Sequence, residues 1–335
     1  MIGVAEKIWF PDTVARWGIR RLCRERLREL TPGATDRLVM RMNEAPIAIA
    51  TGAANDQHYE VPASFFECVL GTHLKYSCGY WTETTSGIDE SEAAMLALCA
   101  ERAGIRDGMR VLDLGCGWGS MSLWIAEAFP RCFVTAVSNS ASQRRFIESR
   151  ASRRGLENLE VLTADMNSFR PEGRFDRVVS IEMFEHMRNY GRLLKQIAGF
   201  LEPEGRLFVH VFCHREHAYF FEDDGRGDWM ARNFFTGGLM PSVDLLSRFD
   251  RDLEVEEQWR VPGSHYQKTS NAWLERLDQR RETVRAILAD GYGEDSADRW
   301  MQRWRLFFMA CAESFGFDNG NEWHVAHYSM RPRRP

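Results

Sequence analysis

The chain has 335 residues and a formal net charge of −5, with 44% apolar and 27% charged residues. This balance is typical of a folded globular protein and excludes a disordered, collagen-like or coiled-coil chain. The excess of acids argues against a nucleic-acid partner and against stable association with an anionic membrane, and no apolar run is long enough to span a bilayer. The eight cysteines include no Cys-x-x-Cys pair and the N-terminus lacks the apolar core of a signal peptide, which predicts reduced thiols and a cytoplasmic protein.

Two helices are predicted near the N-terminus. Apolar residues recur at helical spacing over 14–30, and 37–48 has the pattern of a second helix. The many arginines of the first segment favour a packing helix with a solvated basic face, and a helix that binds lipid or a partner is the alternative. We expect residues 1–57 to form an N-terminal helical arm and residues 58–335 to form one catalytic domain.

From residue 106 onward, strands alternate with helices. Short apolar runs predict strands over 109–115, 133–137, 159–163, 178–181 and 206–212. Helices are predicted over 120–129, 140–154 and 190–201, and Gly155 closes the second of them. This alternation predicts an α/β fold with a doubly wound, mostly parallel sheet.

The segment 214–246 interrupts the alternation. It is rich in Phe, Tyr, Trp, Gly and Asp, and we interpret it as a lid inserted over the site. Beyond it, the pattern predicts C-terminal helices within 271–315, over 271–291 and 296–315, and a last strand over 324–330. The run CHREH (213–217) gathers potential metal ligands but lacks the His-Glu-x-x-His order of a zinc-binding helix, so no metal site is expected.

A glycine-rich turn, DLGCGWG at 113–119, follows the first strand of this region and opens a helix. Glycines there allow a tight turn and a close approach of the backbone to a ligand. The spacing is not Gly-x-Gly-x-x-Gly, no acid stands in 136–139 for the ribose of a dinucleotide, and no Gly-Lys-Ser/Thr of a P-loop follows. Asp113 is instead placed to bind a cationic α-amino group. The combination resembles motif I of class I S-adenosylmethionine methyltransferases, and a tight turn without a ligand is the alternative.

Longer motifs make the resemblance closer. Four segments resemble the cyclopropane-fatty-acid-synthase branch of these methyltransferases: HYEVPASFF (58–66), KYSCGYW (75–81), VLDLGCGWGS (111–120) and IEMFEHM (181–187). Within that branch, QHYEVPASFF, FCHREHAYFFEDD, WMARNFFTGGLMPS and EWHVAHY are most similar to the plant coclaurine-type N-methyltransferases, and the similarity runs from about Trp17 to Tyr328. The resemblance implies a Rossmann-like class I methyltransferase with a seven-stranded sheet, S-adenosyl-L-methionine as cofactor and S-adenosyl-L-homocysteine as product.

The resemblance also implies which residues bind the cofactor. It places the methionine end against Tyr76, Ser77 and Gly115, and the ribose and adenine against 138–143 and 165–166. Two neutral amides would replace the carboxylate that most methyltransferases place after the second strand, since an amide also bonds hydroxyl groups. The full expected set is Tyr76, Ser77, Asp113, Gly115, Gly117, Gly119, Ser138, Asn139, Gln143, Asp165 and Met166.

An acid–base cluster follows a predicted strand, at the edge where open parallel sheets place their active sites. Glu182, Glu185 and His186 stand at i, i+3 and i+4, a spacing that puts the three side chains on one side of a helix. Such a cluster can attract a cationic amine and accept its proton, with Glu185 orienting the ring of His186. The resemblance to coclaurine-type enzymes implies that Glu185 and His186 are the catalytic dyad; a solvated surface turn is the alternative.

A second set of residues matches the same branch. Cyclopropane synthases hold a bicarbonate ion as base with a Cys, a Glu, a His and a Tyr, and the matching residues here are Cys78, Glu185, His210 and Tyr266. Coclaurine-type enzymes keep these residues too, so they do not separate the two chemistries, and bicarbonate is expected only if the chain modifies lipids. Cys311 matches a cysteine once assigned a nucleophilic role, and a buried helix cysteine is the favoured interpretation.

Three functions therefore compete. The favoured one is N-methylation of a bulky small-molecule amine that is aromatic or isoquinoline-like. The alternatives are a cyclopropane-fatty-acyl-phospholipid-synthase reaction on unsaturated acyl lipids and a catalytically silent cofactor-binding protein. Lid aromatics and the acidic balance favour the amine, and a homodimer is left open. The rings expected to wall its pocket are Tyr76, Tyr80, Trp81, 219–221, Trp229, Phe234, Phe235 and Tyr266.

Overall fold

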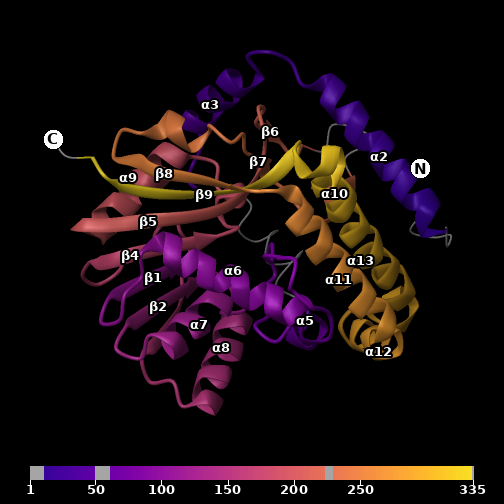
Figure 1. Ribbon diagram of the computed structural model, residues 1–335, viewed down its shortest axis with the longest axis horizontal. Coiled ribbons are helices and arrows are strands. Elements are labelled where there is room, and N and C mark those ends of the chain that lie inside the picture. Colours follow the sequence, from indigo (N-terminus) through magenta and orange to yellow (C-terminus); the bar gives the residue numbers. More distant parts are fainter. Residues whose placement is uncertain (1–10, 50–60, 223–228, 334–335) are drawn as a thin grey trace.

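The computed structural model describes residues 11–49, 61–222 and 229–333. Its centre is a seven-stranded sheet with the strand order β3-β2-β1-β4-β5-β9-β8 (Figure 1). Strands β3 to β5 in that order pair in parallel, and β9 pairs antiparallel with both β5 and β8. The strands are β1 (Arg110–Leu114), β2 (Phe133–Ser138), β3 (Leu159–Thr163), β4 (Phe175–Ile181), β5 (Leu201–His214), β8 (Leu253–Val261) and β9 (Trp323–Pro332). The expected mostly parallel, seven-stranded sheet is confirmed.

Helices cover both faces of the sheet, because neighbouring residues of a strand point to opposite sides. Val111 of β1 belongs to the core shared with α6 (Ile88–Ala103) and α7 (Ser120–Ala128). Leu112, the next residue, belongs to the core shared with α9 (Tyr190–Phe200) on the other face. The sheet is therefore buried from both sides, as the alternation of strands and helices predicts.

Helix α8 (Ala141–Arg154) begins and ends where its sequence signals predict. The hydroxyl of its N-cap residue Ser140 accepts a hydrogen bond from the backbone N–H of Gln143 at 3.3 Å. Gly155 closes the helix with a φ of 66°, a conformation that glycine adopts without strain. The end of β2 and the start of α8 are thereby fixed in one compact turn beside the site.

The C-terminal helices differ from the prediction. The segment predicted as one helix over 271–291 forms two, α11 (Gly263–Gln279) and α12 (Arg281–Tyr292). They are separated at Arg280, whose φ of −109° and ψ of 26° are not helical. The early start of α11 was missed because GSHYQKTS (263–270) is polar and shows little apolar periodicity. Helix α13 (Glu294–Phe315) follows and ends at the predicted residue.

Helix α2 (Asp12–Glu29), the first described element of the arm, lies along α13 (Figure 1). Glu313 of α13 accepts hydrogen bonds from Arg16 at 2.8 Å and from Arg20 at 2.7 Å, with its own side chain 8% exposed. The arginines of this helix thus join it to the core, in agreement with the favoured interpretation of a packing helix. The expected end of the arm at residue 57 lies outside the described residues.

The inserted segment 214–246 begins where β5 ends. Its strands β6 (Tyr219–Phe220) and β7 (Leu239–Met240) pair antiparallel, and α10 (Trp229–Asn233) stands between them in the chain. The remaining elements are α3 (Ala34–Glu44), α5 (Ala63–Val69) and the short 3₁₀ turns η2 (Phe184–His186), η3 (Leu246–Phe249) and η4 (Phe317–Gly320). In the part of the chain that the structure describes, no helix combines the length and the apolar character needed to cross a membrane.

Candidate active site

The glycine turn joins β1 to α7 at the carboxyl edge of the sheet. Gly115, Gly117 and Gly119 have φ values of 78°, 52° and 79°, in the left-handed region that favours glycine. A Cβ on Gly117 would meet no atom within 4 Å, so this part of the turn faces open space. A Cβ on Gly119 would lie 2.7 Å from Ile147 of α8. Gly119 therefore allows α8 to pack against the turn, and it lines neither of the two cavities beside the turn.

These two cavities lie side by side. The acid cavity, of about 100 Å³, lies between the turn and the segment after β4, and the loop cavity, of about 70 Å³, lies between the turn and the ends of β2 and β3. Gly115, Gly117, Gln143 and His186 line both. The other expected cofactor residues are Tyr76, Ser77 and Asp113 in the acid cavity and Ser138, Asn139, Asp165 and Met166 in the loop cavity.

The polar groups of these cavities fit S-adenosylmethionine. Among the described residues, Oγ of Ser120 and Nε2 of Gln143 are buried without a hydrogen-bond partner, and both residues line the acid cavity. Ser138 donates to Oε1 of Gln143 at 2.5 Å, which leaves the amide N–H group as a donor for a ribose hydroxyl. Asp113 is 1% exposed, and burial raises the pKa of its carboxyl to about 6. A cationic amino group beside Asp113 would stabilise its charged form.

The backbone turns sharply at Glu182, directly after β4. Its φ is 49°, and its N–H donates to the carbonyl of His210 on β5 at 2.8 Å, which continues the sheet by one more bond. The helical spacing of Glu182, Glu185 and His186 does not correspond to an α-helix, since only the 3₁₀ turn η2 follows. Glu182, Glu185 and His186 nonetheless all line the acid cavity.

Two donors and a histidine ring converge on the carboxylate of Glu182. The hydroxyl of Tyr266 donates to Oε2 at 2.7 Å, and the backbone N–H of Cys78 donates to Oε1 at 3.4 Å. Nε2 of His210 lies 3.3 Å from Oε1. Cys78 and His210 line neither cavity, so they reach the site through Glu182. The structure thus brings Cys78, His210 and Tyr266 together, as the sequence set requires, around a glutamate outside that set.

Glu185 stands in a different environment. It is 1% exposed, and within the described residues its Oε2 has no hydrogen-bond partner. Burial raises the pKa of Glu182 to about 7, with the charge of Lys75 opposing the rise. Burial and then the charge of Glu182 raise the pKa of Glu185 well above its ordinary value. Two neighbouring carboxyl groups of this kind can exchange a proton with a ligand near neutral pH.

His186 is half-buried and lines both cavities. Its ring stacks on Phe235 of the lid segment, with the ring centres 5.8 Å apart and the planes at 11°. The stack with Phe235 fixes the plane of the imidazole, and the orientation of its ring edge by Glu185 stays a prediction. A stacked imidazole keeps its nitrogen atoms at the ring edge, where they can bond a ligand or a water molecule.

A larger cavity, the outer cavity of about 780 Å³, lies between α2, the lid segment and α13. Four aromatic residues line both the outer cavity and the acid cavity: Phe212, Phe235, Tyr266 and Phe307. The outer cavity therefore leads past these rings to Glu182 and Glu185, the acid pair. Its other aromatic lining residues are Tyr219, Phe220, Phe221, Trp229, Phe315 and Trp323. A cavity lined in this way suits a bulky, flat ligand.

Three of the rings expected in the pocket wall lie elsewhere. Tyr80 and Trp81 contact side chains of α11. Phe234 is 1% exposed and stacks on Phe307, with ring centres 4.2 Å apart. Aromatic residues that are adjacent in the sequence point in different directions, so a count of rings in a segment does not separate wall from core.

Lys75 is the functional side chain that sequence reasoning missed. It is 1% exposed, and its Nζ donates to the carbonyl of Cys78 at 2.8 Å and also to the hydroxyl of Ser77. Its charge lowers the pKa of Glu182. A lysine beside a short aromatic run gives no signal of burial, because most lysines are exposed.

Two further groups take structural positions. Cys311 of α13 lines the outer cavity, and burial raises the pKa of its thiol, which disfavours the nucleophilic thiolate. Nδ1 of His214 accepts hydrogen bonds from the backbone N–H groups of Glu216 at 3.0 Å and His217 at 2.9 Å. The run CHREH therefore shapes the start of the lid segment.

Comparisons with known proteins agree with this geometry. A family model described as mycolic acid cyclopropane synthetase matches residues 49–325. (S)-Coclaurine N-methyltransferase of Thalictrum flavum subsp. glaucum is 37% identical over 322 residues, which cover 95% of this chain and 88% of that protein. The enzyme of the same name from Papaver somniferum is 36% identical over 324 residues, which cover 95% and 90%. A crystal structure of coclaurine N-methyltransferase bound to N-methylheliamine and SAH superposes with a TM-score of 0.94 at 35% identity, covering 98% of this chain and 97% of that one.

These matches extend over the elements that build the site. The family model includes the glycine turn, the acid pair and the lid segment, and the relatives match over nearly their whole length. The polar groups around the turn are those that S-adenosylmethionine requires. The chain therefore belongs to the mycolic acid cyclopropane synthetase family and is a class I S-adenosylmethionine-dependent methyltransferase.

Proposed function

We propose that this methyltransferase N-methylates a bulky small-molecule amine with an aromatic or isoquinoline-like body. The observation that carries the proposal is the position of the Glu182 carboxylate, which Tyr266, Cys78 and His210 surround in the acid cavity, next to the aromatic outer cavity. A buried carboxylate there attracts a cationic amine and can take its proton. The names of the relatives, which describe N-methyltransferases of coclaurine, support the same class of acceptor.

The reaction needs a neutral amine in line with the transferred methyl group. Bound S-adenosylmethionine supplies a methyl group on a positively charged sulfur, and its carbon–sulfur bond breaks as the nitrogen–carbon bond forms. The carboxylate of Glu182 accepts the proton that the amine loses, and His186, which lines both cavities, can pass that proton to water. Phe212, Phe235 and the other shared rings hold the aromatic body and exclude water.

The same geometry argues against the lipid alternative. Bicarbonate in a cyclopropane-synthase mechanism would need the donors of Cys78, His210 and Tyr266 free to bind it. In this chain, the carboxylate of Glu182 already accepts from Tyr266 and Cys78 and lies within bonding distance of His210. Glu182 therefore supplies internally the anion that such a mechanism takes from solution.

The direct test is methyl transfer from S-adenosylmethionine labelled in its methyl group. The protein is incubated in parallel with tetrahydroisoquinoline amines and with vesicles of unsaturated phospholipid, and products are separated by mass. We expect label in the N-methylated amine and none above background in the lipid. Label in the lipid alone would contradict the amine assignment.

Replacing His186 with alanine is expected to lower kcat by about 10²-fold, the usual effect of losing an acid–base group. The dissociation constant of S-adenosylmethionine, measured by calorimetry, should change little, because the other lining residues remain. His73→Ala is the control, since His73 is also half-buried but lines neither the acid cavity nor the loop cavity. An unchanged kcat in His186→Ala would remove His186 from the mechanism.

A further inference from the structure

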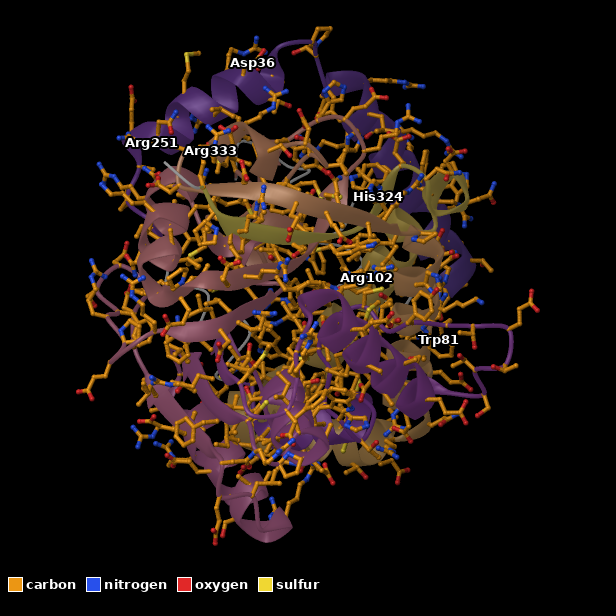
Figure 2. All side chains as sticks on the ribbon, turned by 60° about the vertical axis from the view of Figure 1, so that its left-hand side comes forward. Asp36, Trp81, Arg102, Arg251, His324 and Arg333 are labelled. Carbon is orange, nitrogen blue, oxygen red and sulfur yellow. The ribbon has the colours of Figure 1, made fainter. Side chains whose placement is uncertain are left out.

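A row of side chains crosses the sheet from the acid pair toward its far edge. His210 on β5 is the register partner of His327 on β9, and His327 is also the partner of Trp259 on β8. Partner residues on neighbouring strands share a face, so the three rings form one row. The guanidinium of Arg102 on α6 lies over the ring of Trp259, 5.1 Å from its centre. Figure 2 shows Arg102 between α6 and these strands.

Hydrogen-bond distances link the row into one chain. A terminal nitrogen of Arg102 is 2.8 Å from Nδ1 of His327, and Nε2 of His327 is 2.8 Å from Nδ1 of His210. Nε2 of His210 is in turn 3.3 Å from Oε1 of Glu182. Both histidines are fully buried, whereas Arg102 is half-buried. The chain therefore runs from a guanidinium that water can reach to the carboxylate of the site.

The guanidinium sets the direction of every bond in this chain. Because it has only donors, Nδ1 of His327 must accept. A neutral imidazole carries one N–H, so His327 has its hydrogen on Nε2 and donates to Nδ1 of His210. By the same rule His210 has its hydrogen on Nε2 and donates to Glu182. Burial lowers the pKa of both rings well below the ordinary value, which keeps them neutral.

We propose that Arg102 and His327 are positioning residues for methyl transfer, which fix His210 in the tautomer that donates to Glu182 and so maintain Glu182 as a carboxylate beside the acceptor. The link to an amine acceptor rests on the proposed function, whereas the tautomers do not depend on it. Without Arg102, only the carboxylate of Glu182 favours this direction, and a protonated Glu182 allows the opposite one. His210 then presents a lone pair, and Glu182 must keep a proton to bond it.

Several other groups act on the same carboxylate. Burial opposes its charged form, Lys75 and Tyr266 stabilise it, and its charge in turn raises the pKa of Glu185. The thiols coupled to Glu182 are Cys78 from the loop after α5, Cys99 from α6 and Cys311 from α13, and burial raises the pKa of each. These thiols stay neutral at neutral pH and therefore add no charge beside Glu182. The cation that acts on Glu182 is Lys75, and it remains in place when Arg102 is replaced.

Cys99 also completes a group with His210 and His327 whose potential ligand atoms lie within 4.8 Å of one another. Burial raises the pKa of Cys99 to about 12, and the charges of Lys75 and Arg102 act on the group. Two nearby cations disfavour a metal ion, and the ring-to-ring hydrogen bond of 2.8 Å accounts for the short distance between the histidines.

Nitrogen-15 NMR of the histidine-labelled protein tests the tautomers directly, because a ring nitrogen with a hydrogen differs widely in chemical shift from one without. With S-adenosylhomocysteine bound, we expect His210 and His327 to carry hydrogen on Nε2 alone. Arg102→Met should shift His210 toward the other tautomer. Arg102→Lys should restore the wild-type pattern, since an ammonium is also only a donor. Hydrogen on Nδ1 of His210 in the wild type, or unchanged tautomers in Arg102→Met, would overturn the proposal.

The pH profile of kcat/KM with the accepted amine tests the consequence. Loss of the donor raises the pKa of Glu182, so Arg102→Met should move the acidic limb upward by about one pH unit, with the rate regained at high pH. Arg110→Met is the matched control, because Arg110 also lies over a ring, that of Phe175 at 5.4 Å, but outside the row. An equal loss at every pH would indicate a merely structural role and overturn the proposal. If no amine is methylated, the proposed function fails while the NMR result still decides the tautomers.

Discussion

Glu182→Gly should lower kcat for the amine by about 10³-fold and leave S-adenosylmethionine bound, as expected for loss of a buried proton acceptor. The variant removes the carboxylate on which the donors of Tyr266, His210 and Cys78 converge. It should fold, because Glu182 has a φ of 49°, a conformation that suits glycine better than glutamate. Steady-state rates, calorimetric cofactor binding and the thermal midpoint are the measurements. A variant with near wild-type kcat would contradict the central role of this carboxylate.

Bicarbonate should restore part of the activity of Glu182→Gly. The substitution leaves three donors around a space that a small oxyanion can enter, and an oxyanion accepts the same hydrogen bonds as a carboxylate. Rates are measured against bicarbonate concentration in the variant and in the wild type, with chloride at equal ionic strength as the control. The wild type should not respond, because Glu182 already takes these donors. Absence of rescue by bicarbonate, formate and acetate alike would contradict the proposed donor arrangement.

Gly117→Leu should abolish detectable binding of S-adenosylmethionine. A side chain at this position projects into the open space that Gly117 shares with both the acid cavity and the loop cavity. The φ of 52° adds strain of about 1–3 kcal/mol for a residue with a side chain. Isothermal calorimetry with S-adenosylmethionine and S-adenosylhomocysteine is the measurement.

Gly108→Leu separates strain from obstruction of the cavities. Gly108 also has a positive φ, of 92°, and open space around its Cβ position, but it stands at the exposed approach to β1. The two variants should therefore lose similar stability, and only Gly117→Leu should lose the cofactor. Normal cofactor binding by Gly117→Leu would overturn the assignment of the turn.

The glycine turn and its neighbouring elements could be predicted because their signals are local, whereas the individual cofactor residues rest on the resemblance to the family. The strand, the glycine turn and the following helix are contiguous in 110–128, and each has its own sequence pattern. Ser140 and Gly155 likewise mark the limits of α8 by capping chemistry that depends on near neighbours. Every expected cofactor residue except Gly119 lines a cavity beside this turn.

The acid–base half depends on contacts between distant segments. The spacing of Glu182, Glu185 and His186 suggests a helix. Instead, the backbone N–H of Glu182 donates to the carbonyl of His210 on β5, so the chain still pairs with the sheet at Glu182. Arg102 and His327 are 225 residues apart and meet because α6 covers the strands at the antiparallel edge. Neither the hydrophobic periodicity nor a motif within one segment can predict a contact between such distant residues. The chain of hydrogen bonds from Glu182 to Arg102 is therefore visible only in the folded structure.

The outer cavity is lined in part by an element that the two cavities beside the glycine turn do not share, so the residues of that element can change independently in evolution. Helix α2 contributes Ile19, Leu22, Cys23 and Arg26 to the outer cavity, whereas none of its described residues lines the acid cavity or the loop cavity. If the outer cavity admits the acceptor as proposed, mutations at these residues of α2 should alter which acceptor enters without contacting the methyl donor. Selection or design can therefore vary the cavity-facing residues of α2 to change acceptor preference, while Arg16 and Arg20 keep the helix joined to Glu313.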